Sequence, residues 1–272
     1  MHPTRGLLIA SLFAAAVAHG ATDIHRTFNV APGGTLTLDT DAGDVRVEPG
    51  AAGVTVDVKR TRNLNVTFAQ SGNDVTVSAK DEGPISWFHW NSDDARFIVT
   101  VPSAYNVRVS TSGGEVHVGD IRGAIRVHTS GGSLEVGNVT GPVDARTSGG
   151  SINVGRVEGE VHAHTSGGSI TIGDAAGTID AETSGGSIHA RLSRAPRTDS
   201  KLSTSGGSIS VSIANNIALD VDARSSGGGV ESDVPVTIQG RQDDDSLLGK
   251  INGGGPRLVL RSSGGGIHIK RL

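Results

Sequence analysis

The chain has 272 residues, of which 3% are aromatic, 40 are glycine and none is cysteine. So few aromatic side chains argue against one large globular core, and the lack of cysteine excludes a disulfide framework. The formal net charge of −4 argues against nucleic acid or an anionic lipid surface as the partner.

Residues 1–20 have the pattern of a secretory signal peptide. Arg5 precedes an apolar run from Leu7 to Ala18, and small residues suited to cleavage follow the run. The run is too short for a comfortable membrane span, so we expect none after the signal is removed. The sequence therefore predicts an exported protein that is periplasmic, exposed on the cell surface or secreted. Without Arg5, 23 of the 24 basic residues remain against 28 acidic residues, which is a mildly acidic balance.

Residues 21–110 have the alternating pattern of β-strands with one buried face, but no fixed repeat. Strands are predicted at Thr35–Asp39, Asp44–Glu48, Val54–Arg60, Leu64–Gln70, Asp74–Lys80 and Arg96–Val101. We interpret this region as an N-terminal β cap with the first irregular coils of a solenoid, because a bare solenoid end would expose unpaired strand edges.

The segment from Asp81 to Ala95 interrupts this pattern and contains both tryptophans of the chain. Trp87, Phe88 and Trp90 have two interpretations. They can form an aromatic cover over the open end of the solenoid, which we favour. Alternatively, they are a contact site that stacks on a sugar face or enters a groove of a partner.

Residues 111–272 carry a repeated phrase. Its Ser-Gly-Gly triplets begin at 18-residue intervals and then at wider ones: Ser112, Ser130, Ser148, Ser166, Ser184, Ser205, Ser226 and Ser263. Each phrase contains two short stretches of period-two alternation, separated by the Ser-Gly-Gly bend and by a Gly-x-x-x-Gly frame. The sequence therefore predicts an all-β fold, a parallel β-solenoid (β-helix or β-roll) with coils of roughly 18 residues. The interval from Ser226 to Ser263 is long enough for two coils.

Three local expectations follow from stacked coils. The glycines of each bend are expected to need positive φ, which glycine adopts without a steric penalty. A corner of each coil is expected to be filled by one buried side chain. A threonine before each triplet is expected to bond to the turning backbone. The corner residues are Ile121, Val139, Val157 and Ala175, and the threonines are Thr129, Thr147, Thr165 and Thr183.

Outward side chains are predicted to form rows along the stack. One row holds Arg126, Asp144, His162 and Asp180, and the next holds His128, Arg146, His164 and Glu182. His162 and His164 with neighbouring carboxylates are a conceivable metal site, but alternating charge on a soluble surface is the simpler interpretation. The run Asp243–Asp245 is interpreted as a solvated loop. The bends lack the recurring aspartate of calcium β-rolls, so no metal site is assigned.

The sequence contains no recognisable catalytic motif. The serines recur in bends without a nucleophile elbow, and the glycine-rich turns lack the lysine and the following helix of a phosphate loop. Parallel β-helices include polysaccharide lyases and hydrolases with an acidic cluster in a side groove, and no such cluster stands out from the rows. We therefore assign no catalytic and no cofactor-binding residues, and we expect no cofactor.

The stretches Phe97–Pro102 and Val107–Val118, with the closing Gly253–Ile267, resemble the bacterial putative-adhesin family of unknown function. The resemblance covers most of the chain after the signal, and it implies a β-solenoid related to head domains of autotransporter-type adhesins. It implies an envelope location and no catalytic residues. The predicted function is an exported, non-enzymatic contact scaffold of the cell envelope whose partner is a protein or a glycan. The alternatives are a polysaccharide-binding or carbohydrate-active β-helix and an accessory protein of an envelope-stress system.

Overall fold

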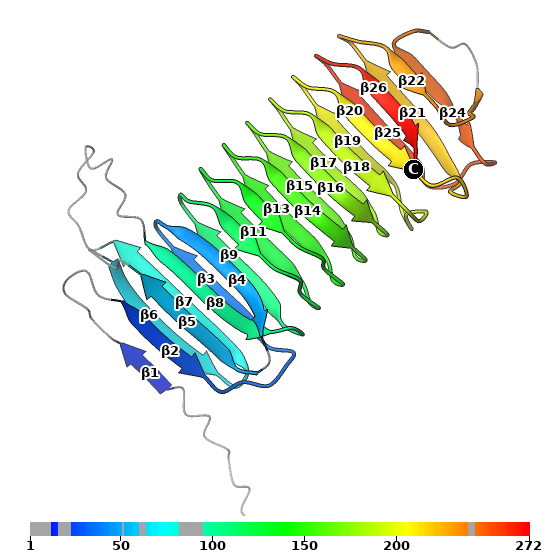
Figure 1. The fold of residues 1–272 in the computed structure, drawn as a ribbon. Coiled ribbons are helices and arrows are strands. Elements are labelled where there is room, and N and C mark those ends of the chain that lie inside the picture. The colour runs from blue at the N-terminus through cyan, green and yellow to red at the C-terminus, as the bar shows by residue number, and fades with distance from the viewer. Residues whose placement is uncertain (1–11, 16–22, 51, 60–63, 82–94, 239–242) are drawn as a thin grey trace, which may run out of the picture.

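The structure is a computed structural model that describes residues 12–15, 23–50, 52–59, 64–81, 95–238 and 243–272. These residues form strands, bends and turns in an elongated stack of two sheets (Figure 1). Within the described ranges, no helix has the length and apolarity needed to cross a membrane.

The two sheets are named sheet A and sheet B, and their strands are given in spatial order. Sheet A has 14 strands: β1 (Leu12–Ala15), β6 (Leu64–Ser71), β7 (Asp74–Asp81), β3 (Thr35–Thr40), β9 (Asn106–Thr111), β11 (Ile125–Thr129), β13 (Val143–Thr147), β15 (Val161–Thr165), β17 (Ile179–Thr183), β19 (Ser200–Thr204), β25 (Arg257–Ser262), β21 (Leu219–Ser225), β24 (Ser246–Ile251) and β23 (Thr237–Ile238). Sheet B has 12 strands: β2 (Ile24–Phe28), β5 (Val54–Lys59), β8 (Arg96–Pro102), β4 (Asp44–Gly50), β10 (Val116–Val118), β12 (Leu134–Val136), β14 (Ile152–Val157), β16 (Ile170–Ala175), β18 (Ile188–Leu192), β20 (Ile209–Ile213), β26 (Ile267–Arg271) and β22 (Val230–Ser232).

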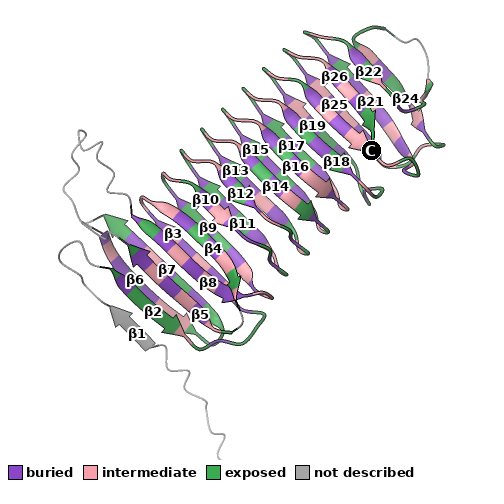
Figure 2. Ribbon diagram, viewed as in Figure 1, coloured by how far each residue is buried: buried purple, intermediate pink, exposed green. Residues whose placement is uncertain are grey.

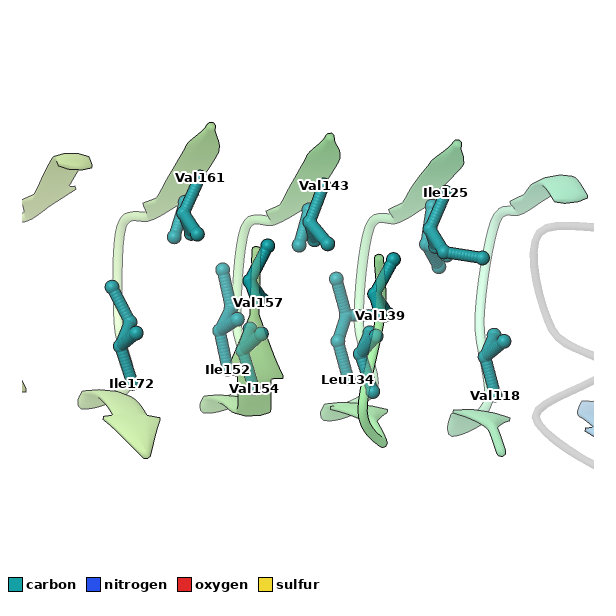
Figure 3. Close-up of a cluster of buried hydrophobic side chains, with 14 of the residues drawn as sticks. Val118, Ile125, Leu134, Val139, Val143, Ile152, Val154, Val157, Val161 and Ile172 are labelled. Carbon is teal, nitrogen blue, oxygen red and sulfur yellow. The ribbon is translucent and has the colours of Figure 1, made fainter. Parts of the chain in front are cut away.

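The predicted β-solenoid is confirmed. Each central coil gives one strand to each sheet, and strands of successive coils pair in parallel at the 18-residue interval, so that Val143 lies between Ile125 and Val161. Burial alternates along the strands of the central coils (Figure 2), and their inward side chains are mostly aliphatic. The expected corner residues are buried as well, and Val139 forms parallel bridges to Ile121 in the preceding coil and to Val157 in the next. Figure 3 shows Val139 and Val157 among the buried side chains of successive coils. One continuous aliphatic core therefore runs along the whole stack.

At the N-terminal end, the spatial order of the strands differs from their order in the chain. The coil β3–β4 pairs in parallel with β9–β10 on one side and with β7–β8 on the other. Beyond β7–β8, the strands β6 and β5 run antiparallel, and β1 and β2 pair with them in turn. β1 belongs to the segment expected to be a signal peptide, and that assignment stays a prediction.

At the C-terminal end, the last coil of the chain lies inside the stack. β25–β26 is placed between β19–β20 and β21–β22, with parallel pairing on both sides. β24 then pairs antiparallel with β21, and β23 pairs antiparallel with β24. The interval from Ser226 to Ser263 therefore does not hold the two further parallel coils that its length suggests, because β23 and β24 turn back over β21.

The expectation of positive φ at the bends is wrong for most of the triplets. Among the Ser-Gly-Gly glycines only Gly114 has positive φ, at 94°. The stacking distance is what excludes larger residues: a Cβ on Gly150 would collide with the backbone of Gly132 in the preceding coil, and the same clash recurs at Gly168 and Gly186. At these positions, the second glycine of the bend, neighbouring coils approach too closely for a side chain.

The threonine expectation is confirmed. Thr147 Oγ1 donates to the carbonyl oxygen of Gly132 at 2.8 Å, and Thr165 Oγ1 donates in the same way to Gly150 at 2.8 Å. These hydroxyls are buried and join each coil to the coil before it. Next to the coil β25–β26, the hydroxyl bonds to the coil that is adjacent in space and not to the one that precedes it in the chain. Ser225 Oγ donates to the carbonyl oxygen of Gly265 at 2.7 Å.

Candidate binding surface

The outer face of sheet A carries the two predicted rows, and their register is as expected. Arg126, Asp144, His162 and Asp180 lie opposite one another in sequence, and so do His128, Arg146, His164 and Glu182. The first row extends to Arg108 on β9 and to Lys201 on β19, and the second extends to Ser110 and Ser203. The rows lie on rigid parallel strands, so the spacing of their side chains along the stack is about 4.8 Å.

Asp144 is the centre of the ion pairs on this face. Its Oδ1 lies 2.8 Å from Arg146 Nε and its Oδ2 lies 3.4 Å from Arg126 Nε, so one carboxylate serves two arginines. The Asp144 side chain is 22% exposed, whereas Arg126 and Arg146 are 66% and 59% exposed. The guanidinium groups therefore keep open donor positions toward solvent.

His162 has weaker carboxylate neighbours. Its Nδ1 lies 3.8 Å from Asp180 Oδ2, and its Nε2 lies 3.9 Å from Glu160 Oε2. His164 is placed beside it on the same face, two residues along β15. In the part of the chain that the structure describes, no group of three or more histidine or acidic side chains is arranged to hold a metal ion.

A shallow depression of about 300 Å³ opens between β13, β15 and β17. It is lined by Arg146, His162, Ala163, His164, Asp180 and Glu182. The depression brings nitrogen donors from β13 and β15 next to carboxylate acceptors from β17. Such a surface can bind a ligand that carries both negative charge and hydroxyl groups.

Sheet B carries a different kind of cluster, which the sequence reasoning missed. His117 lies between two carboxylates, with Nε2 at 3.3 Å from Glu48 Oε1 and Nδ1 at 3.0 Å from Glu135 Oε2. Glu48 also pairs with Arg46 at 2.6 Å. The 18-residue interval predicts the contact with Glu135, but the contact with Glu48 requires that β4 stacks on β10. The charges of this cluster are largely satisfied by one another.

A second groove, of about 460 Å³, follows the corner where Ile121 and Val139 lie. Its rim is organised by hydrogen bonds between coils, since Asp120 Oδ1 accepts the backbone N–H of Asn138 at 2.7 Å. Hydrogen bonds from the Asn138 backbone and side-chain amide lower the pKa of Asp120, despite an opposing effect of burial. Asn138 in turn accepts the backbone N–H of Arg156 at 3.0 Å, so these polar groups maintain the stack.

The predicted contact residues Trp87, Phe88 and Trp90 lie outside the described residues. The ends that flank their segment are placed at the bend side of the coil β3–β4. The N–H of Asp81 donates to Asp41 Oδ2 at 3.2 Å, and the N–H of Asp44 donates to the carbonyl of Ala95 at 2.9 Å.

The run Asp243–Asp245 is attached to the bend between β21 and β22. The carbonyl oxygens of Asp244 and Asp245 accept the N–H groups of Val230 and Ser225, both at 2.9 Å. The backbone of this run therefore helps to cover the C-terminal end of the stack.

Solved structures similar to this chain include three that are each called a putative adhesin or putative cell adhesion protein. The one from Bacteroides fragilis NCTC 9343 is 14% identical, with 92% of this chain and 97% of that chain covered and a TM-score of 0.48. The one from Parabacteroides merdae ATCC 43184 is 11% identical, covering 95% and 100%, with a TM-score of 0.41. The one from Clostridium sporogenes ATCC 15579 is 12% identical, covering 92% and 100%, with a TM-score of 0.33.

No curated protein sequence matches the chain. A family model described as Toastrack DUF4097 matches residues 34–270, which span the coils from β3 to β26. The match includes the Ser-Gly-Gly bends and both rows of sheet A. On this match, the chain belongs to the Toastrack DUF4097 family.

Proposed function

We propose that the chain is an exported, non-enzymatic β-solenoid that serves as an adhesin-like contact scaffold of the bacterial cell envelope. The observation that carries this proposal is the outer face of sheet A, where in-register parallel strands hold long rows of polar side chains over an aliphatic core. A binding face built on rigid strands loses little conformational entropy when a partner binds.

The geometry of the face supports contact with an extended partner. Equivalent side chains recur at each coil, so a partner with its own repeat can engage several coils at once and gain avidity. The depression between β13 and β17 is shallow and open, whereas small-molecule sites are usually enclosed and mostly apolar.

A second candidate function is a polysaccharide-binding or carbohydrate-active β-helix. The observation that favours it is the pair of carboxylates, Asp180 and Glu182, which line the same depression as Arg146. Glycoside hydrolysis uses two carboxylates that flank the scissile bond, whereas simple binding needs only hydrogen bonds to the sugar.

Three measurements on one preparation test the proposal. The tagged protein is fractionated from bacterial cells, its binding to isolated cell envelopes is measured, and a glycan panel is analysed for both binding and cleavage. We expect recovery outside the cytoplasm, saturable envelope binding and no cleavage of any glycan. Cytoplasmic retention or the absence of envelope binding would overturn the scaffold, and turnover of a glycan would establish the enzymatic alternative.

A further inference from the structure

We propose that sheet A binds an acidic polysaccharide, one with carboxylates along its chain, through a cationic strip of Arg108, Arg126, His128, Arg146 and His164. This inference rests on the proposed function and names the chemical class of the partner. The strip crosses β9, β11, β13 and β15 and so runs along the length of the stack.

The first argument is the register of like charges. Arg108 lies directly opposite Arg126. In the neighbouring row, Arg146 lies between His128 and His164. Like charges directly opposite one another on neighbouring strands are unfavourable. The aliphatic core and the threonine hydrogen bonds, which involve none of these residues, join the coils.

The second argument is the shortage of carboxylates. On the outward positions of these four strands the only acidic side chain is Asp144, and Arg126 and Arg146 share it. Among the described residues, Arg108 has no carboxylate within salt-bridge distance. By contrast, Lys80 on β7 pairs with two aspartates, at 2.9 and 3.1 Å. The strip is a local excess of positive charge on a chain whose net charge is −4.

The third argument separates a glycan from other polyanions. At one end the strip meets the 300 Å³ depression, where Asp180 and Glu182 lie beside Arg146 and the two histidines of β15. These carboxylates repel the phosphates of an anionic membrane or a nucleic acid. They accept hydrogen bonds from sugar hydroxyls, while the arginine donates to a sugar carboxylate. An acidic polysaccharide offers both groups on one narrow chain.

The test measures binding of the purified protein to polygalacturonate, which has a carboxylate on every sugar. Fully methyl-esterified polygalacturonate is the uncharged match, and vesicles of phosphatidylcholine with phosphatidylglycerol are the membrane arm. We expect saturable binding of polygalacturonate that weakens as salt rises, with no binding of the ester or the vesicles. The double variant His128→Gln/His164→Gln should bind polygalacturonate more weakly than the wild type does.

The triple variant Arg108→Gln/Arg126→Gln/Arg146→Gln should lose at least about tenfold in affinity. The matched control is Arg191→Gln/Arg194→Gln/Arg197→Gln, which removes the same charge from exposed positions away from the strip and should bind as the wild type does. If the triple variant does not fold, Arg108→Gln alone tests the strip, because this exposed side chain has no ion pair among the described residues to lose.

Absence of polygalacturonate binding, an equal loss in the control variant, or equal binding of the vesicles would each overturn the inference. The envelope-binding measurement keeps the two proposals apart. If envelope binding persists without polygalacturonate binding, the polysaccharide assignment fails and the scaffold proposal stands. If both are lost, both proposals fail.

Discussion

The second glycine of a central bend lies close to the backbone of the preceding coil. A Cβ at Gly150 would collide with the backbone of Gly132, whereas a Cβ at Gly149 would meet Gly131 O at 3.0 Å and a Cβ at Gly113 would meet nothing within 4 Å. We therefore expect Gly150→Ala to lower the free energy of unfolding by about 2–3 kcal/mol, because the coils must separate to admit the methyl group. Gly113→Ala should be nearly neutral. Denaturant unfolding measures both, and equal losses would contradict the stacking argument.

Buried threonine hydroxyls link neighbouring coils through the glycine carbonyls. Replacing Thr165 by Val keeps the shape of the side chain but removes the 2.8 Å hydrogen bond to Gly150 O. We expect a loss of about 1–2 kcal/mol, since the carbonyl is left without this donor inside the protein. Thr171→Val, at an exposed position on β16, is the control and should change the melting temperature little. A neutral Thr165→Val would show that these bonds add nothing to stability.

The sequence predicts where the bend glycines lie but not why glycine is required there. The spacing of the Ser-Gly-Gly triplets predicts the bend, the 18-residue coil and both outward rows, because each follows from a period in the sequence. The reason for the glycine is not contained in that period. Positive φ and close stacking both favour glycine, and only the placement of Gly132 beneath Gly150 separates the two explanations.

At the scale of elements, the inserted coil β25–β26 is held partly by one ion pair. Arg261 donates from Nη2 to Asp222 Oδ2 at 2.8 Å and from Nη1 to the Asp222 carbonyl at 2.6 Å, joining β25 to β21. The hydrogen bond from Arg261 lowers the pKa of Asp222 below the usual range of an aspartate, despite the opposing effect of burial.

A lowered pKa in the folded protein means that the ion pair stabilises the fold above the unfolded-state pKa. This stability is lost as the pH falls through the folded-state pKa. We therefore expect Asp222→Asn to lower the unfolding free energy at neutral pH by about 1–3 kcal/mol, the range for hydrogen bonds to charged groups. The difference between variant and wild type should shrink below about pH 4. Thermal melts across pH measure it, and a difference that grows on acidification would contradict the assignment.

The order of coils at the two ends could not be predicted from the sequence. Period-two alternation predicts which side chains of a strand are buried, but it does not predict which coil lies next to that strand. The sequence predicts irregular first coils within residues 21–110, yet nothing in it indicates that β7–β8 lies beyond β3–β4 in the stack. The same holds for the last coil, whose motif is regular although its place is between two earlier coils.

At the scale of the whole molecule, antiparallel strands flank the parallel coils at the N-terminal end of both sheets and at the C-terminal end of sheet A. β6 and β5 pair with β7 and β8, and β24 pairs with β21. Sheet B ends instead at β22, which pairs in parallel with β26. The rows of sheet A lie on the long face between these ends, and their exposed side chains are available to a partner.

Tryptophan fluorescence of the whole protein reports on the segment from Asp81 to Ala95, because both tryptophans of the chain lie within it. Its two interpretations stay predictions. Sequence analysis favours the aromatic cover, so we expect blue-shifted tryptophan emission that acrylamide quenches poorly. Truncating Trp87, Phe88 and Trp90 to Ala should then cost several kcal/mol of stability, as large aromatic side chains do when removed from a core. Red-shifted, readily quenched emission together with unchanged stability would instead support the contact site.

Stability of the whole stack should not depend on a bound cation. In the bends, Ser151 Oγ accepts the N–H of Ser169 and Ser169 Oγ accepts the N–H of Ser187, at 3.2 and 3.1 Å, so these side-chain oxygens hold the next coil. Calcium would need several oxygen ligands at each turn, and the serine hydroxyl is a weaker ligand than the carboxylate of a calcium β-roll. We expect the same circular dichroism spectrum and melting temperature in EDTA and in excess calcium. A large gain of β structure on adding calcium would show instead that the bends bind the cation. Hydrogen bonds between coils alone predict no such change.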